Sequence, residues 1–75
     1  MSDSELLAML IGSGTPSESA IDLSWRILES AWGDLGNLAA LDFSELCRFA
    51  GMGIAKSSSI IAAVELARRL KRAVM

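Results

Sequence analysis

The sequence predicts an all-α fold, and three observations support that prediction. Apolar residues recur at helical spacing almost throughout, and no stretch shows the apolar–polar alternation typical of a half-buried strand. Residue pairs that cap helix starts occur several times, and glycines separate the segments that follow them. The 75 residues, 52% of them apolar, are enough for one small domain with a single core. We therefore expect five helices in one domain, residues 1–75.

The first helix is predicted from Ser2 to about Ile11. Ser2 followed three residues later by Glu5 is typical of a capping box, in which each side chain bonds the backbone amide of the other residue. The apolar segment after this pair has helical spacing, and Gly-Ser-Gly at 12–14 is expected to end the helix.

A second helix is predicted from Thr15 to about Ala31. Thr15 is the expected cap, Pro16 suits the first helical position, and Glu18 is placed to bond back to the cap. Its polar stripe is predicted to contain Glu18, Asp22, Arg26 and Glu29. Its apolar side, expected in the core, contains Ile21, Trp25, Leu28 and Trp32, widened by Ala20, Ile27 and Ala31. Core packing is the prediction for both tryptophans, with stacking on exposed bases as the alternative.

The remaining helices are shorter connectors and one long terminal segment. Asp34 is expected to cap a short helix through Leu38 and Ala39, and Asp42 with Glu45 predicts a helix through about Phe49. After Gly-Met-Gly at 51–53, a last helix is predicted from about Ile54 into the low seventies. Its expected apolar stripe is Ile60, Ile61, Val64, Ala67 and Leu70.

The two glycine pairs reveal an internal repeat. Ser-Glu-Leu precedes Gly-Ser-Gly by five residues and Gly-Met-Gly by four, and an isoleucine follows each pair after seven residues. Each unit would be a short helix, a tight hairpin and a longer amphipathic helix, and neither could bury its apolar face alone. We therefore expect a five-helix bundle of two helix-hairpin-helix units, at about 2–32 and 42–73. A pseudo-two-fold duplication would relate them, with a short connector helix within 33–41.

Composition narrows the function classes. The chain has no histidine, so the commonest general base is missing, and a zinc site of the usual histidine and cysteine kind is excluded. Paired carboxylates such as Asp42 and Glu45 fit helix caps better than acid–base roles. We expect no catalytic residues, no metal, no cofactor and no small-molecule substrate. The single Cys47 is expected to be a small buried hydrophobe rather than a nucleophile.

The same residues bear on location. A lone cysteine cannot form an internal disulfide, which favours a reducing cytosol. No apolar run approaches the ~20 residues of a membrane span. No basic segment precedes the first apolar run, as it would in a signal peptide. We therefore expect a cytoplasmic protein that does not enter a membrane.

Charge is divided unevenly along the chain, whose net charge is −2. Residues 1–47 hold one basic residue and eight acidic ones, whereas residues 48–75 hold six basic residues and one acidic one. Such asymmetry favours an anionic partner for the second half. The alternative is that the basic residues form only the solvated face of a helix.

The Gly-Met-Gly hairpin is the candidate site. Glycines permit a tight reversal, and the first amides of the following helix lack partners in the helix and have its dipole behind them. Such a terminus suits a phosphate oxygen, and a lysine follows one turn later. The predicted phosphate-binding residues are Gly51, Met52, Gly53, Ile54, Ala55, Lys56 and Ser57. Peripheral contacts are predicted for Arg48, Arg68, Arg69 and Arg72. The alternative is that the glycines only make a turn.

The stretch FAGMGIAK at 49–56 resembles the helix-hairpin-helix motif of DNA-binding proteins that do not read sequence. The resemblance implies that hairpin amides and Lys56 hold the DNA backbone. The first copy departs from the motif, because Ser17 replaces the lysine and two acids, Glu18 and Asp22, follow it. Since these acids would repel phosphate, the first hairpin is expected to be a structural partner of the second.

Residues 2–69 resemble the N-terminal region of the bacterial RadC family, in the order and spacing of both hairpins and the segments between them. The resemblance implies a DNA-repair context. It also implies a further domain, similar to JAB/MPN-type metal-dependent peptidases, that this chain lacks and that would carry any hydrolase activity. Two functions stay open at this point: weak, sequence-independent DNA binding, or a protein-interaction domain that supports the missing domain.

Overall fold

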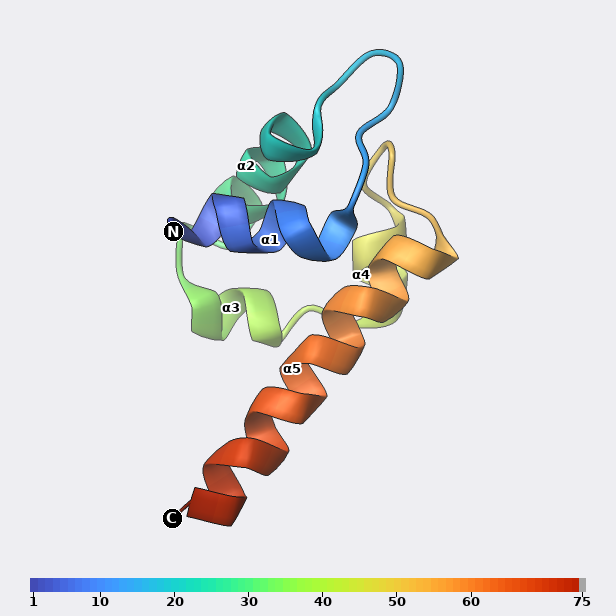
Figure 1. Ribbon diagram of the computed structural model, residues 1–75. Helices are drawn as coiled ribbons and strands as arrows, with labels where there is room; N and C mark the ends of the chain where they lie inside the picture. Colours follow the sequence, from blue (N-terminus) through green and yellow to red (C-terminus); the bar gives the residue numbers. More distant parts are fainter. Residues whose placement is uncertain (75) are drawn as a thin grey trace.

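The computed structural model describes residues 1–74, and within them the all-α prediction is confirmed. Five helices follow one another and no β-strand is formed in this range (Figure 1). Their bounds are α1 Asp3–Ile11, α2 Ala20–Ser30, α3 Leu35–Ala39, α4 Phe43–Cys47 and α5 Ile54–Val74. None of these helices is both long and apolar enough to cross a membrane.

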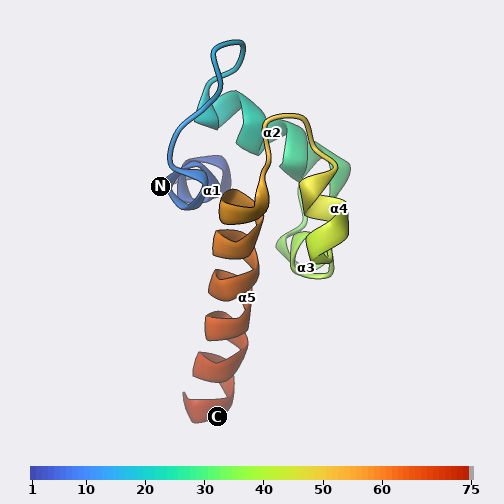
Figure 2. The ribbon, with the colours of Figure 1, turned by 90° about the vertical axis from the view of Figure 1, so that its right-hand side faces the viewer.

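α5 contacts both the first pair of helices, through α1, and the short helix α4. α1 packs mainly against α2, while α5 contacts α1 on one side and α4 on the other. Seen from two directions, the second half of α5 extends beyond the other helices (Figures 1 and 2). The molecule is consequently elongated, with extents of 42 × 24 × 20 Å.

Side-chain caps begin the first four helices. Ser2 and Asp42 form complete capping boxes with Glu5 and Glu45, as the sequence predicts. The Asp34 carboxylate accepts the Asn37 amide at 3.0 Å, which confirms its predicted role as the cap of α3. These starts are local, because the capping side chain accepts from an amide only three residues further along and needs no distant partner.

The predicted start of the second helix is wrong. α2 begins at Ala20, and Ser19 caps it by accepting the Asp22 amide. Thr15 and Glu18 instead pair their backbones, with N–O distances of 2.7 and 3.2 Å, so Pro16 lies in a turn. A Cβ on Gly14 would lie 2.2 Å from the Glu18 carbonyl oxygen, so this close turn requires glycine.

The helices bury one continuous core. Its members include Leu7, Ile11, Leu23, Ile27, Leu46 and Ile60. On α2 the buried face also includes Ser24, whose hydroxyl donates to the Ala20 carbonyl at 2.7 Å and is therefore satisfied. The buried residues of α2 are Leu23, Ser24, Ile27 and Leu28, and Leu23 also reaches towards Gly51 of the loop that precedes α5.

The prediction that both tryptophans pack in the core is wrong. Trp25 is 53% exposed and Trp32 is 89% exposed. Trp25 lies off the buried face of α2, which contains Leu23 and Ile27, and Ile21, also expected in the core, is 39% exposed. Trp32 follows the end of α2 with a φ of 58°, which turns its side chain away from the core.

The apolar stripe of α5 is buried only in the first half of the helix. Ile60 is 1% exposed and Val64 is half-buried, but Leu70 is 63% exposed. Ala67 is also exposed. The prediction of one continuous buried stripe therefore fails beyond Val64, because the helix outruns the elements that cover it.

Two helix–loop–helix segments occur in the predicted order. α1 and α2 flank the loop 12–19, α4 and α5 flank the loop 48–53, and α3 lies between the two segments. Their helices differ in length, since α4 ends at Cys47 rather than near Phe49 and α5 extends to Val74. The pseudo-two-fold relation between the segments stays a prediction.

Replacing Leu23 by alanine tests the position of the core. Leu23 is fully buried, so Leu23→Ala should lower the free energy of unfolding by about 2–5 kcal/mol. Trp32→Ala removes a larger side chain that lies in solvent, so it should change this free energy by about 0.5 kcal/mol or less. Urea denaturation followed by circular dichroism measures both. A larger loss for Trp32→Ala than for Leu23→Ala would contradict the assigned face of α2.

Candidate nucleic-acid interface

The loop 48–53 reverses the chain between α4 and α5 by a glycine turn and a backbone hydrogen bond. Gly51 has a φ of 90°, a left-handed conformation that favours glycine, whereas the φ of Gly53 is not positive. The Met52 amide donates to the Phe49 carbonyl at 3.0 Å, which closes the turn. The Met52 side chain is 8% exposed and packs in the core, so it anchors the loop between the two glycines.

The start of α5 presents backbone amides without acceptors. The Ser57 amide donates to the Gly53 carbonyl at 3.0 Å, the first backbone bond of the helix. The amides of Gly53, Ile54, Ala55 and Lys56 have no hydrogen-bond acceptor within residues 1–74. Gly53, Ile54 and Ala55 are exposed, so an outside acceptor can reach this end of the helix, where the dipole is positive.

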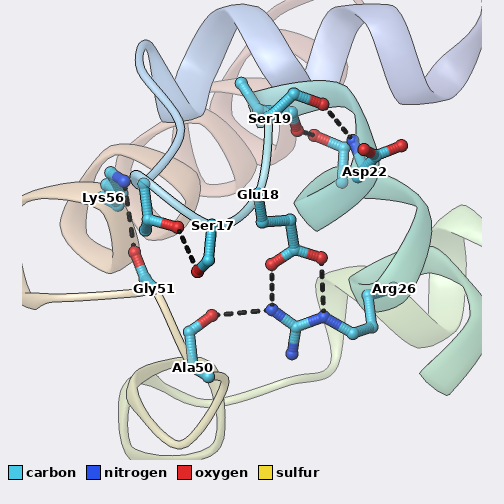
Figure 3. Close-up of polar contacts among 11 residues, drawn as sticks. Ser17, Glu18, Ser19, Asp22, Arg26, Ala50, Gly51 and Lys56 are labelled. Atoms are coloured by element: carbon cyan, nitrogen blue, oxygen red, sulfur yellow. Dashed lines mark hydrogen bonds and ion pairs between the residues drawn. The ribbon is translucent and has the colours of Figure 1, made fainter.

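Lys56 is fixed over the same loop. Its Nζ atom donates to the Gly51 carbonyl oxygen at 3.1 Å (Figure 3). An ammonium group has three N–H bonds, so this contact leaves two for another acceptor. The lysine therefore holds its charge beside the hairpin instead of extending freely into solvent.

The first hairpin lies directly against the second, and Arg26 links them (Figure 3). The guanidinium of Arg26 donates to both carboxylate oxygens of Glu18, at 3.0 and 2.6 Å. It also donates to the Ala50 carbonyl at 2.7 Å. A Cβ on Gly51 would lie 3.0 Å from the Thr15 methyl group, so the two loops are in close contact.

The Arg26 contact changes the electrostatics of the first hairpin. Hydrogen bonding to Arg26 lowers the pKa of Glu18, and the same bonds raise the pKa of Arg26. Glu18 therefore stays ionised, but its charge is paired within the protein. The expected repulsion of phosphate by this acid is reduced accordingly.

The structure brings most of the predicted phosphate-binding residues together at one end of α5. Gly51, Gly53, Ile54, Ala55 and Lys56 lie there. Met52 and Ser57 are predicted members whose polar groups are already used. The Met52 amide is bonded to Phe49, and Ser57 is fully buried with its amide bonded to Gly53.

Cys47 provides a hydrogen-bond partner for the buried hydroxyl of Ser57. The thiol of Cys47 lies 3.4 Å from Ser57 Oγ and donates to it. Cys47 is half-buried, slightly more exposed than the predicted small core residue. Its role is to pack α4 on α5 and to satisfy this hydroxyl.

The four peripheral arginines are spread along the domain. Arg48 is exposed at the end of α4, just before the hairpin. Arg68 donates to the Ala39 carbonyl at 3.1 Å, and Arg69 pairs with Glu65 at 3.0 Å. Arg72 is exposed. Since α5 rises about 1.5 Å per residue, the last three lie about 18 Å or more beyond Lys56 along the helix.

Sequence reasoning missed Arg26, which it placed on a solvated stripe. The available signal was that Arg26 is the single basic residue among the first 47. Its partner Ala50 is 24 residues away and contributes a backbone carbonyl, so no sequence motif marks the contact. Within residues 1–74 no cluster of three or more potential metal ligands is found.

Comparison with known proteins identifies the family. Residues 1–58 match the family model described as UPF0758 N-terminal. The chain belongs to the UPF0758 family. A UPF0758 protein of Flavobacterium johnsoniae is 54% identical over 69 residues, covering 92% of this chain and 30% of that protein. Another, from Chloroflexus aurantiacus, is 46% identical over 72 residues, covering 96% of this chain and 31% of that protein.

The chain thus spans only about a third of the length of these relatives. A Geobacter sulfurreducens UPF0758 protein, 49% identical over 72 residues, is likewise covered over 31% of its length. No solved structure matches the chain.

The two hairpin glycines of this UPF0758 domain should tolerate alanine differently. Gly51→Ala forces a side chain onto a φ of 90° and against Thr15, which should cost about 1–2 kcal/mol or more of unfolding free energy. Gly53→Ala meets no atom within 4 Å, and its cost should stay at about 1 kcal/mol or less, from the poorer N-cap alone. Thermal or urea unfolding measures both, and equal effects would contradict the loop geometry.

Acid should weaken the link between the hairpins. Because the pKa of Glu18 is lowered from its ordinary 4.5, the pair contributes stability above that pH and loses it as pH falls through the folded-state pKa. Glu18→Gln should therefore show a smaller loss of stability than the unmodified UPF0758 domain between about pH 6 and about pH 3. The control is Glu29→Gln, since Glu29 is exposed and its carboxylate makes no hydrogen bond within residues 1–74. Unfolding curves across pH that are identical for Glu18→Gln and the unmodified chain would refute the role of the pair.

Proposed function

We propose that this UPF0758 domain is a non-catalytic module that binds the DNA backbone without reading sequence. The observation that carries the proposal is the set of exposed, acceptor-free amides at Gly53, Ile54 and Ala55, next to the Lys56 ammonium held by Gly51. One phosphate oxygen would accept hydrogen bonds from the amides, and a second would lie beside the Lys56 ammonium. Nothing in this contact distinguishes one base from another, so binding would not depend on sequence.

The chemistry of the hairpin supports an anion rather than a neutral ligand. Amides at a helix N-terminus carry the positive end of the helix dipole, and α5 is the longest helix of the domain. Lys56 adds a full positive charge within the same loop. The loop is preformed by the buried Met52 and the Arg26–Ala50 bond, so little ordering would be needed on binding.

The expected affinity is low. Affinity for DNA comes mainly from counterion release, and one hairpin neutralises few phosphates. The net charge of −2 also opposes association with a polyanion. Arg48 would be the nearest additional contact, and Arg68, Arg69 and Arg72 would contribute only if α5 lay along the groove rim. We place this activity in the cytoplasm and in a DNA-repair context, following the RadC resemblance.

A second candidate function is a protein-interaction domain that supports a JAB/MPN-type domain in the full-length relatives. An apolar groove formed by α1, α3 and α5 favours it, and the groove is distinct from the hairpin. Any metal-dependent hydrolase activity would then belong to that other domain. The two functions use different surfaces and do not exclude each other.

The DNA-binding proposal is tested by titrating the ¹⁵N-labelled chain with a short duplex and with single-stranded DNA. Amide shifts should centre on Gly53, Ile54, Ala55 and Lys56, and the dissociation constant should rise steeply with salt. Lys56→Glu should weaken binding by about tenfold or more, because it replaces the cation beside the phosphate with an anion.

The matched control is Lys71→Glu, which makes the same change in net charge about 22 Å further along α5. It should weaken binding by no more than about threefold, through the general field alone. Equal losses for the two variants, or shifts that avoid the hairpin, would reject the assigned site. The amide spectrum of each variant without DNA confirms that it is folded.

A further inference from the structure

A second surface of the domain is apolar and lies away from the hairpin. A groove of about 520 Å³ runs between α1, α3 and the middle of α5. Its walls include Leu6 and Leu10 from α1, Leu35 from α3, and Val64 and Ala67 from α5. Leu6 is 51% exposed and Leu35 is 52% exposed, so the groove is open to solvent rather than filled by neighbouring side chains.

α5 carries a second set of exposed apolar side chains in its second half. Leu66, Leu70 and Val74 are spaced four residues apart, so they form one stripe, and they are 68%, 63% and 75% exposed. This is the half of the helix that extends beyond the other helices (Figures 1 and 2). Leu6, Leu10 and Leu35 in the groove and the three residues of the stripe are all exposed, and clusters of exposed apolar side chains are typical of interaction sites.

Charged residues border the groove. Asp3 lies at the α1 edge, and Arg68 and Lys71 lie at the α5 edge. Arg68 is held by the Ala39 carbonyl across the groove, whereas Lys71 makes no hydrogen bond within residues 1–74. An apolar floor with a polar rim is the usual composition of a protein–protein contact, and Lys71 favours an acidic residue on the occupant.

The lengths of the relatives indicate what covers this surface. The region matched by this chain is 30% of the Flavobacterium johnsoniae protein, and the family model is described as N-terminal. Most of that protein therefore follows the segment matching α5. Because α5 itself forms one wall of the groove, the following polypeptide starts beside the groove, at the high effective concentration of a tethered partner.

We propose that in full-length proteins carrying this domain, the polypeptide that follows α5 packs an apolar helix into the groove between α1, α3 and α5. The occupant buries Leu6, Leu10 and Leu35, contacts Val64 and Ala67 of α5, and places an acidic side chain opposite Lys71. A groove walled by helices accepts the ridge of another helix by ordinary helix packing. This proposal rests on the second candidate function, the protein-interaction domain, and does not depend on DNA binding, which uses the opposite end of α5.

The test compares the full-length Flavobacterium johnsoniae protein with the 75-residue chain by hydrogen exchange. Glutamate is placed at Leu10, which lines the groove, or at Met9, which is 67% exposed on the same helix outside it. In the full-length protein, glutamate at the position matching Leu10 should speed exchange in the second half of α5 by about tenfold. Glutamate at the position matching Met9 should change this rate less than about twofold.

In the 75-residue chain both variants should leave exchange in that half of α5 within about threefold of the unmodified rate, because the groove there faces water. The proposal is overturned if the Leu10 variant has the same effect at both lengths, or none in the full-length protein. Sedimentation equilibrium of the 75-residue chain distinguishes a second copy as occupant: a dimer abolished by Leu10→Glu would assign the groove to self-association and reject the proposal. Circular dichroism of each variant confirms that the helices are retained.

Discussion

The contact of Arg26 with both loops is the constraint on which the hairpin geometry depends. One guanidinium bonds the Glu18 carboxylate from the first loop and the Ala50 carbonyl from the second. Arg26 is only partly exposed, and its planar group can satisfy both acceptors at once, which a lysine could not do in the same geometry. The loop 48–53 has few other anchors: Met52 in the core, and Lys56 on the Gly51 carbonyl. Arg26 thus helps determine where the amides of α5 point.

This constraint also explains how two similar hairpins come to differ. The first hairpin uses its acid to hold Arg26, and its loop contacts Gly51 through Thr15. Its acidic side chain is therefore paired within the protein. The second hairpin uses glycine and a buried methionine for its turn, and its helix amides stay free of acceptors within residues 1–74. An acidic first half is compatible with an anion site in the second because Glu18, the acid of the adjoining loop, is paired with Arg26.

Features set by neighbours in sequence were predictable, and those set by distant packing were not. Ser2, Asp34 and Asp42 were identified as caps because a cap bonds an amide three residues away. The start of α2 was misplaced because Thr15 and Pro16 suit a turn as well as a helix start, and the backbone pairing with Glu18 decides between them. The face of α2 was misassigned because Trp25 and Leu23 both lie on plausible apolar stripes, and only tertiary packing, which buries Leu23 and leaves Trp25 53% exposed, distinguishes them. The hairpin glycines and Lys56 were recognisable as a local motif, whereas the Arg26–Ala50 contact spans 24 residues.

α5 connects the two surfaces of the domain. Its first amides face the anion site, its middle packs in the core at Ile60, and its second half carries the exposed leucines. A helix of 21 residues without glycine or proline is stiff, so its two ends keep a fixed relation. A polypeptide packed against the second half of α5 would therefore determine the direction in which the hairpin points. Binding at the hairpin would in turn place whatever follows the helix at a defined distance and angle from the phosphate backbone, without any conformational change in the domain.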